Sequence, residues 1–298
     1  IMGIIKKSKL PYVISTVFVD YFETEANHPK INRRILSKVF STDQLEYIKT
    51  IARAIKGQEK ITDYRYLLLG QKNSIKRIVK NARALLPNSL NEYKRLYKSY
   101  GIEQEYKVIP NAIDINIFNN NFEAKKEFAK FKGAVICVGQ FTPVKNQLNI
   151  IKALNGTKYR VYFIGNPSSN AIKYYKKCKE EASKNIHFIP LAKQEDLAQI
   201  YKMAKVHVLA SWFETTGLVS LESAYMGCNI VITNKGDQVE YFIDDAFYCK
   251  PEEPKSILDA VNKAYNSPFN EELKQRIGDN YTWTKTAHKT HQLYQKAI

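Results

Sequence analysis

The chain has 298 residues, 44% of them hydrophobic and 25% charged, which is the composition of a globular protein and excludes a disordered one. Its length is typical of two domains. A formal net charge of +17 favours an anionic partner. No helix-turn-helix, zinc-finger or aromatic RNA-binding pattern accompanies that charge, so we do not expect nucleic acid as the partner.

The positive charge is concentrated in the first part of the chain. Residues 1–115 hold 21 Lys and Arg against 11 Asp and Glu. This excess favours attachment to an anionic membrane surface, and a solvated lysine-rich surface is the alternative. No stretch approaches the roughly 20 apolar residues that a membrane span requires. We therefore expect a cytoplasmic protein, held peripherally at the inner face of the cell membrane.

The four cysteines are widely spaced, which favours neither a disulfide framework nor a zinc site. Cys137 and Cys228 fall in or beside apolar strand patterns. With Cys178 and Cys249, they are expected to be small core residues in a reducing compartment. The five histidines make no ligand pair with them, so we expect no structural metal.

The first 120 residues are expected to form one α/β domain. Residues 4–9 have the character of the last turn of a helix, so the domain would lack its first strand and helix and be truncated. A strand at 12–19 follows, and then one long amphipathic helix over 31–57, with an apolar stripe of Ile35, Val39, Leu45, Ile48 and Ile51. The remaining expected elements are a helix near 74–82, a strand at 84–87, a helix capped by Asn88 and Ser89 and ended by Gly101, and a strand at 106–109.

The rest of the chain alternates strands and helices after a polar linker at 119–132. We expect strands at 134–139, 159–165, 186–189 and 206–210, and helices at 147–154, 169–184, 195–203 and 254–266. This alternation predicts a doubly wound parallel sheet over 121–280. Ligands of such sheets bind at the carboxyl ends of the strands, where Gly139, Gly165 and Glu214 fall.

Two glutamates, separated by seven residues, flank an expected strand-to-helix turn. Glu214 lies in the turn, and Glu222 lies more than a turn into a helix that begins near Gly217. The start of that helix offers unpaired N–H groups and the positive end of a dipole, and Gly217 leaves room for a diphosphate. A nucleotide sugar would fit between the two carboxylates. The alternative is a helix-entry acid followed by an exposed helical residue.

The stretch from Glu214 to Glu222, followed by residues 227–232 and Gly236 to Glu240, resembles the donor-site signature of glycosyltransferase family 4 (glycosyl transferases group 1). Residues 84–115 also resemble that family, with Ala112 in place of its usual glycine. The resemblance implies the GT-B fold, in which two Rossmann-like domains face a central cleft. Residues 1–120 would then form the acceptor-side domain, residues 121–280 would bind the nucleotide sugar, and residues 281–298 would pack back on the first domain.

The resemblance also implies a role for each residue of the signature. Glu222 would hold the ribose hydroxyls, and Glu214 would contact the donor sugar near the reacting carbon. Lys145 would stabilise charge on the diphosphate, and Gln140 stands where the family has an arginine. The family's first-domain histidine has no counterpart here; Asp20 is a candidate in its place, with a helix cap or loop acid as the alternative, and His28, next to Pro29, is expected to be structural. The full set of implied donor contacts is Gly139, Gln140, Lys145, Gly165, Thr216, Gly217, Leu218 and Glu222.

These features together predict a retaining hexosyltransferase of the EC 2.4 class. Its donor would be a UDP- or GDP-sugar and its acceptor a glycan or lipid-linked glycan, in the synthesis of cell-surface polysaccharide such as lipopolysaccharide. The resemblance implies metal independence and no cofactor, and the lack of an Asp-x-Asp metal motif is consistent with this expectation. A glycosidase acid and base would explain neither Lys145 nor the strands that end in glycine. Two alternatives stay open: a non-catalytic nucleotide-binding or scaffold protein of the same fold, and a sugar-nucleotide epimerase.

Overall fold

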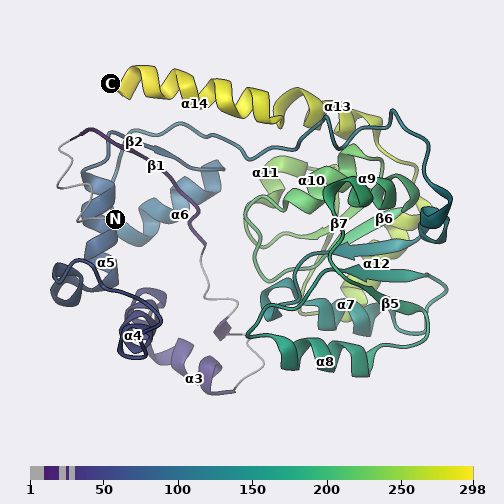
Figure 1. The fold of residues 1–298 in the computed structure, drawn as a ribbon, viewed down its shortest axis with the longest axis horizontal. Helices are drawn as coiled ribbons and strands as arrows, with labels where there is room; N and C mark the ends of the chain where they lie inside the picture. The colour runs from purple at the N-terminus through teal and green to yellow at the C-terminus, as the bar shows by residue number, and fades with distance from the viewer. Residues whose placement is uncertain (1–9, 20–24, 27–30, 298) are drawn as a thin grey trace. The chain divides into compact units, whose positions relative to one another are not determined.

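The structure is a computed structural model that describes residues 10–19, 25–26 and 31–297. Contacts divide the chain into two compact units, Ile1–Pro110 with Ala287–Ile298, and Asn111–Thr286 (Figure 1). Three expectations, the helix end at residues 4–9 and the roles weighed for Asp20 and His28, lie outside the described residues. Within the described part of the chain, no helix combines the length and the apolarity needed to cross a membrane.

The first unit is built on parallel pairing of two short strands. Each residue of one strand pairs in register with the other, from Val13 with Ala84 to Ser15 with Leu86. The expected strand at 106–109 is reduced to a parallel bridge between Leu85 and Tyr106. Leu293 of the last helix is buried with Ala84, Leu86 and Ile109. The unit consists of β1 (Val13–Ser15), α3 (Ile31–Val39), α4 (Thr42–Ile55), α5 (Arg65–Lys80), β2 (Ala84–Leu86), α6 (Leu90–Tyr100) and the later turns of α14 (Trp283–Ala297).

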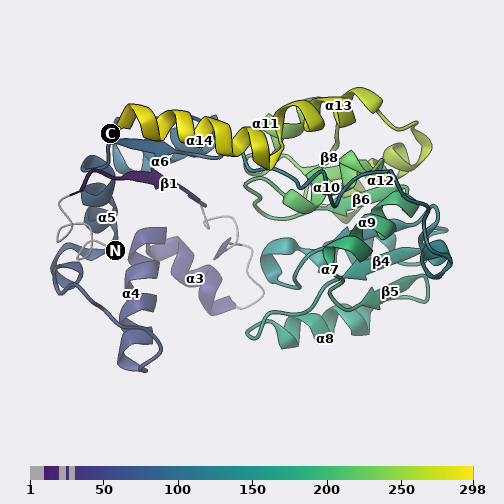
Figure 2. The ribbon, with the colours of Figure 1, turned by 45° about the horizontal axis from the view of Figure 1, so that its top comes forward.

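The prediction of a single long helix over 31–57 is wrong. The chain forms two helices, α3 and α4, which are separated after Val39 (Figure 2). Ser41 caps α4 and forms a capping box with Gln44, which satisfies backbone donors and favours a new helix start. Of the predicted apolar stripe, Leu45 is buried, but Ile35 and Val39 are exposed. The helix predicted near 74–82 corresponds to the later part of α5, which Gly70, with a non-helical φ of 69° and ψ of −178°, separates from a short helical segment that begins at Arg65.

The helix α6 begins and ends as the sequence predicts. The Ser89 side chain accepts a hydrogen bond from the Glu92 backbone N–H at 2.9 Å, and Gly101 ends the helix in the left-handed conformation. The Glu92 side chain is itself fully buried and accepts hydrogen bonds from the backbone N–H groups of Phe18 and Asn88. This carboxylate therefore ties the end of β1 to the end of β2, a role that local sequence did not reveal.

The second unit is organised on a six-stranded sheet. Every neighbouring pair is parallel, and the strand order is β5-β4-β3-β6-β7-β8. This arrangement confirms the predicted doubly wound sheet. Its strands are β3 (Val135–Val138), β4 (Val161–Ile164), β5 (Ile186–Ile189), β6 (Val206–Leu209), β7 (Asn229–Thr233) and β8 (Phe247–Cys249). Its helices are α7 (Gln147–Leu154), α8 (Ile172–Glu181), α9 (Gln194–Met203), α10 (Leu218–Tyr225), α11 (Gln238–Phe242), α12 (Pro254–Asn266) and α13 (Glu271–Asn280).

Helices bury both faces of this sheet, because alternate residues of each strand point to opposite sides. One core contains Ile136, Ile164 and Leu209 of the strands, packed with residues of α9, α10 and α13. The other contains Val135, Phe163 and further strand residues, packed with α7, α8 and α12. The four cysteines are free and buried, as expected for small core residues. Within the described residues, no group of three or more His, Cys, Asp or Glu side chains is placed to hold a metal ion.

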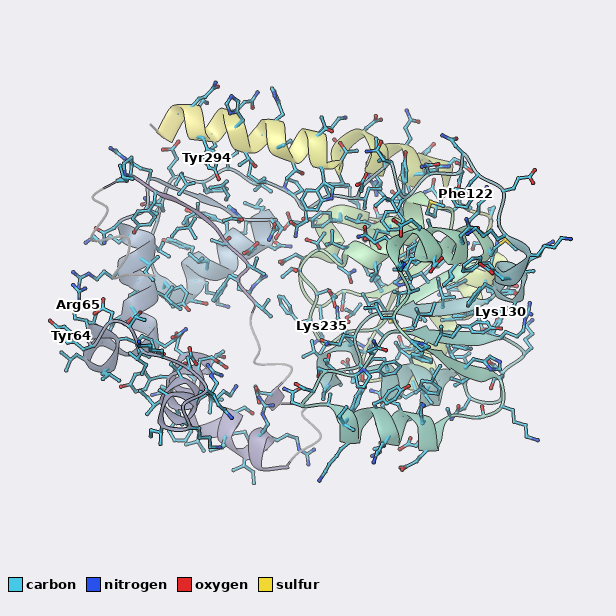
Figure 3. The ribbon with its side chains drawn as sticks, in the orientation of Figure 1. Tyr64, Arg65, Phe122, Lys130, Lys235 and Tyr294 are labelled. Carbon is cyan, nitrogen blue, oxygen red and sulfur yellow. The ribbon has the colours of Figure 1, made fainter. Side chains whose placement is uncertain are left out.

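The segment predicted as a linker, residues 119–132, is instead packed into the second unit. It contains the short 3-10 helix η1 (Lys126–Phe131), in which Phe128 and Phe131 are buried. Phe122, labelled in Figure 3, packs against the same core. The Lys202 ammonium lies 4.7 Å from the centre of its ring. Three aromatic rings therefore anchor this charged segment in the second unit. The linker was predicted from the charged residues, and these give no indication of the packing of the rings.

Candidate functional site

The site lies where the connections of the second sheet reverse direction. From β3 the chain continues to β4 and β5 on one side, whereas β6 is followed by β7 and β8 on the other. The carboxyl ends of β3 and β6 therefore flank the switch point, where open parallel sheets place their ligand crevice. Lys145 follows β3, and Glu214 follows β6.

Lys145 and Glu214 form an ion pair at this switch point. The Lys145 ammonium contacts Glu214 Oε1, and the Ser211 hydroxyl donates to the same oxygen at 3.0 Å. The side chain of Glu214 is only 8% exposed, and that of Lys145 is 27% exposed. A carboxylate this well buried needs a charged partner and a hydrogen bond, and it has both. The pair brings together residues that are far apart in the sequence.

The backbone of Glu214 is held by the turn that follows β7. Glu214 forms a parallel bridge with Gly236, and its carbonyl accepts a hydrogen bond from the Asp237 N–H at 2.8 Å. A Cβ atom on Gly236 would stand 2.0 Å from the Glu214 carbonyl oxygen. The glycine is therefore required by close packing of the two turns, which explains why the sequence signature continues beyond Glu222.

The helix α10 begins at this site without a side-chain cap. Gly217 is its N-cap residue, in the left-handed conformation with φ of 66°, and its carbonyl accepts from the N–H groups of Ser220 and Leu221. The fully buried Gln238 lies against it, so that a Cβ atom on Gly217 would stand 2.0 Å from Gln238 Nε2. Leu218 is 36% exposed. An uncapped helix start with the positive end of its dipole is suited to bind a phosphate group.

Glu222 lies on α10 in surroundings that differ from those of Glu214. The hydroxyl of the fully buried Tyr201 donates to Glu222 Oε2 at 3.3 Å. Burial raises the pKa of the Glu222 carboxyl to about 7, against the smaller opposing effect of this hydrogen bond. Near neutral pH the Glu222 carboxyl therefore exists in both protonation states.

Comparison with known proteins assigns the family. The family model described as glycosyl transferases group 1 matches residues 118–282, more than half of the chain. The chain belongs to the glycosyl transferases group 1 family. It is 25% identical over 178 residues to a D-inositol 3-phosphate glycosyltransferase of Nocardia farcinica, a match that covers 54% of this chain and 40% of that relative. This chain thus matches less than half the length of that relative.

Two solved structures share the fold of this group 1 chain. Sucrose-phosphate synthase of Thermosynechococcus elongatus superposes with a TM-score of 0.66 at 17% identity, over 82% of this chain and 65% of that one. HepE of Anabaena, solved in complex with UDP and glucose, superposes with a TM-score of 0.66 at 14% identity, over 99% of this chain and 88% of that one. These likenesses, with the parallel sheets described above, confirm the predicted α/β fold of the GT-B type.

Thr216 has an interior position in this group 1 site. Its hydroxyl accepts a hydrogen bond from Asn111 Nδ2 at 3.0 Å and donates to the Tyr241 hydroxyl at 3.3 Å. The residue is 2% exposed. Its hydroxyl therefore connects the turn before α10 to Asn111 and to Tyr241 of α11.

Gly139 and Gly165, the other glycines of the predicted site, stand at the ends of neighbouring strands. The Gly139 N–H donates to the Ile164 carbonyl at 3.0 Å, and a Cβ atom on Gly165 would stand 2.2 Å from the Gly139 carbonyl oxygen. The side chain of Gln140 is exposed, while its carbonyl accepts from Gln147 Nε2 at 3.0 Å. Gln140 therefore contributes no charge to the loop that holds Lys145.

Two residues at the site were not singled out from the sequence. Asn146 adopts a left-handed conformation, and its amide donates to the carbonyls of Ala210 at 3.0 Å and Pro251 at 2.7 Å, which fixes the loop after β3 to the end of β6. An asparagine directly after a lysine in a strand-end turn was the available signal. His207 is buried in β6, and neither ring nitrogen has a partner among the described residues. Burial lowers its pKa to about 3, so it is neutral at pH 7.

Proposed function

We propose that this chain carries the donor site of a retaining family 4 glycosyltransferase. It would transfer a hexose from a UDP- or GDP-sugar to a glycan or lipid-linked acceptor, in the assembly of cell-surface polysaccharide, without a metal ion or other cofactor. HepE, which shares the fold, was solved with UDP and glucose, and this supports the donor class. The D-inositol 3-phosphate glycosyltransferases among the relatives support transfer to a hydroxyl of an acceptor.

One observation carries the proposal: an uncapped helix start at the switch point, beside a lysine that a buried glutamate holds in place. The N–H groups at the start of α10 would bind the distal phosphate of the donor. Lys145 would place a compact positive charge beside the leaving group. The two together supply the charge that a metal ion provides in other transferases, so metal independence is part of the proposal.

In the proposed step the oxygen of the acceptor hydroxyl bonds to the anomeric carbon on the face from which the diphosphate leaves. The bond between that carbon and the phosphate oxygen breaks, its electron pair stays on the oxygen, and the acceptor proton passes to that oxygen. Negative charge grows on the leaving phosphate, where the α10 N–H groups and Lys145 stabilise it. Glu214, fixed by Ser211 and Lys145, would orient the sugar, and Glu222 would accept hydrogen bonds from the ribose.

The acceptor side of the proposal rests on charge. Residues 1–115 carry 21 Lys and Arg against 11 Asp and Glu, an excess of ten positive charges. Such a surface attracts phosphorylated lipid carriers and anionic lipids. We therefore place the reaction at the inner face of the cell membrane, with a lipid-linked glycan as the acceptor.

A thermal-shift titration with UDP, GDP, ADP and their sugar conjugates, with EDTA present, tests the donor site. A ligand at 100 times its dissociation constant stabilises the folded state by about 2.7 kcal/mol, which raises the melting temperature by several degrees. We expect one nucleotide class to do so, and Lys145→Ala to reduce the shift. Lys177→Ala is the matched control, because Lys177 on α8 also pairs with a glutamate, at 3.6 Å, outside the site.

Three outcomes separate the readings. A shift with sugar transfer to a glycan supports the proposal. A shift without transfer or donor hydrolysis identifies a nucleotide-binding protein, and turnover of the donor without an acceptor identifies an epimerase. Equal shifts in Lys145→Ala and Lys177→Ala would refute the role of Lys145.

A further inference from the structure

The helix α3 turns its apolar side outward. Ile35, Leu36 and Val39 are 56%, 43% and 69% exposed, while Ser37 is 6% exposed. At about 100° per residue the three apolar side chains share an arc of roughly 100°, and Ser37 lies on the opposite side. A surface helix of a globular protein normally buries its apolar side and exposes its polar one. The amphipathicity of α3 is therefore inverted with respect to the core.

A basic side chain borders this apolar arc. Arg34 and Lys38 are exposed on the side of Ile35 away from Leu36; by helical geometry Lys38 lies about 60° from Ile35, and Arg34 lies about 100° from it, farther round the helix. Neither makes an ion pair with a residue that the structure describes. Residues 31–80 as a whole contain twelve Lys and Arg against four Asp and Glu. An exposed apolar stripe with a basic margin is the pattern of helices that lie in the interface of anionic membranes.

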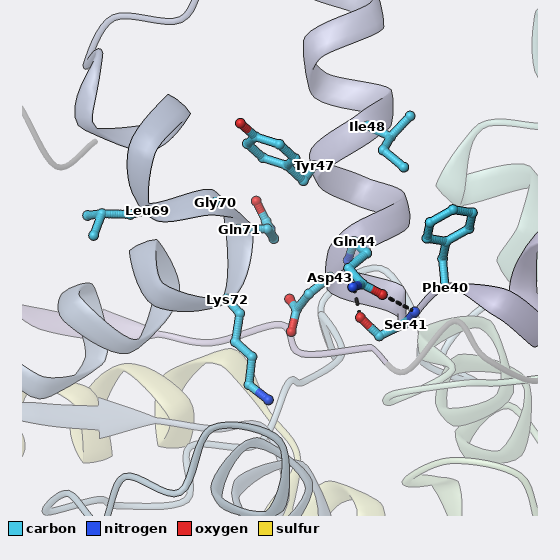
Figure 4. A pocket seen from close by; sticks show the side chains of 10 residues that line it. All are labelled: Phe40, Ser41, Asp43, Gln44, Tyr47, Ile48, Leu69, Gly70, Gln71 and Lys72. Atoms are coloured by element: carbon cyan, nitrogen blue, oxygen red, sulfur yellow. Dashed lines mark hydrogen bonds between the residues drawn. The ribbon is translucent and has the colours of Figure 1, made fainter.

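The apolar surface continues beyond the end of α3. Phe40, the next residue, lines a hollow of about 470 Å³ together with Tyr47, Ile48 and Leu69 (Figure 4). The capping box of Ser41 and Gln44 at the start of α4 lies at this hollow, and its hydrogen bonds are drawn with dashed lines in Figure 4. Ile48 is 49% exposed. Lys72 and Asp43 also line the hollow, which therefore has one basic and one acidic side chain beside its apolar ones.

We propose that α3, with Ile35, Leu36 and Val39 inserted and Arg34 and Lys38 at the lipid phosphates, docks the chain onto an anionic lipid surface. The inference deepens the membrane attachment of the proposed function and rests on it. Charge complementarity favours an anionic lipid over other occupants. An apolar partner protein would offer no negative charge to the basic side chains, and a second copy of this basic unit would repel them. Lipid phosphates satisfy the cations while acyl chains cover the apolar side chains.

Sedimentation with vesicles of phosphatidylcholine, with and without phosphatidylglycerol, tests the docking surface. The whole chain should bind the anionic vesicles, and added salt should weaken binding. Ile35→Asn with Val39→Asn should reduce the partition coefficient roughly tenfold or more, and Arg34→Gln with Lys38→Gln should reduce it by about fivefold or more. The matched controls are on α8: Ile172→Asn, at a residue 44% exposed, and Lys173→Gln with Lys176→Gln, at exposed lysines.

Sedimentation velocity and a nucleotide thermal shift on the same variants complete the test. All variants change exposed residues outside the donor site, so their nucleotide response should equal that of the wild type. Loss of vesicle binding in the α3 variants alone supports the proposal. Equal vesicle binding in the α3 and α8 variants overturns it. A wild-type dimer that is absent in the α3 variants also overturns it. A normal nucleotide shift without vesicle binding refutes the docking surface alone, whereas vesicle binding without any nucleotide shift refutes the donor site alone.

Discussion

Replacing Glu222 by glutamine should stabilise the chain, and the gain should depend on pH. Burial raises the pKa of this carboxyl from 4.5 to about 7, which means that the folded state disfavours its ionised form. The contribution to stability is therefore fully present below pH 4.5 and is lost as the pH rises through 7. By pH 8.5 the ionised carboxylate costs the folded state about 3 kcal/mol. Glutamine removes the charge and keeps an oxygen that accepts the Tyr201 hydrogen bond.

Urea unfolding between pH 4.5 and pH 8.5 measures this effect. The difference in unfolding free energy between Glu222→Gln and the wild type should grow from a few tenths of a kcal/mol to about 3 kcal/mol. At the upper pH the melting temperature should rise by about 6–12 °C. Glu180→Gln, at an exposed glutamate on α8, is the control and should show a small difference that does not change with pH.

A difference that stays constant across the pH range would refute the reasoning, because only a displaced pKa produces the slope. The same displacement should appear in nucleotide binding. If the ribose hydroxyls donate to the ionised carboxylate, affinity for the nucleotide should fall by up to about tenfold per pH unit below pH 7 in the wild type. In Glu222→Gln that affinity should be lower at pH 8 and nearly independent of pH.

Three further predictions concern packing and reactivity. Gly165→Ala should lower the unfolding free energy by about 2–4 kcal/mol, because its Cβ would collide with the Gly139 carbonyl oxygen. Gly139→Ala should lower it by only about 1–2 kcal/mol, because its Cβ would meet open space. Urea unfolding measures both changes. Thr216→Val should lower the unfolding free energy by about 1–3 kcal/mol, because two hydrogen bonds are lost. Calorimetry should show that its nucleotide affinity is unchanged. A large loss of affinity would contradict the interior position of the Thr216 hydroxyl. Iodoacetamide at pH 8 should leave the cysteines of the folded chain unmodified and should alkylate all four in denaturant. The reason is that all four are buried in the folded state, and burial raises the pKa of Cys137 to about 12. Mass spectrometry counts the added groups.

The elements of the second unit were the most predictable from the sequence. Three expected elements, the helix over 147–154, the strand over 186–189 and the helix over 254–266, match the structure at both ends. Their apolar residues recur at the period of the element, and Pro254 marks a helix start. The short elements β8 and α11 were missed, since three to five residues carry too little periodicity.

The sequence located the helix start at the candidate site but not the contacts around it. The spacing of Glu214, Gly217 and Glu222 located a helix start, and the structure has one there. The ion pair of Glu214 with Lys145 joins residues 69 positions apart, and the contact of Glu222 with Tyr201 joins different helices. No local pattern indicates either contact, so neither could be foreseen from the sequence.

The sequence by itself determined the order of the elements, the strand-end glycines and the helix caps, because these depend on residues within a few positions of one another. Only the tertiary structure decided which side of each element meets the core. The apolar residues of α3 show the difference. Their helical spacing was recognisable in the sequence, but the side of the helix that is buried carries Ser37, not these residues. Burial and pKa are properties of what surrounds a side chain, and most of those neighbours come from distant parts of the chain.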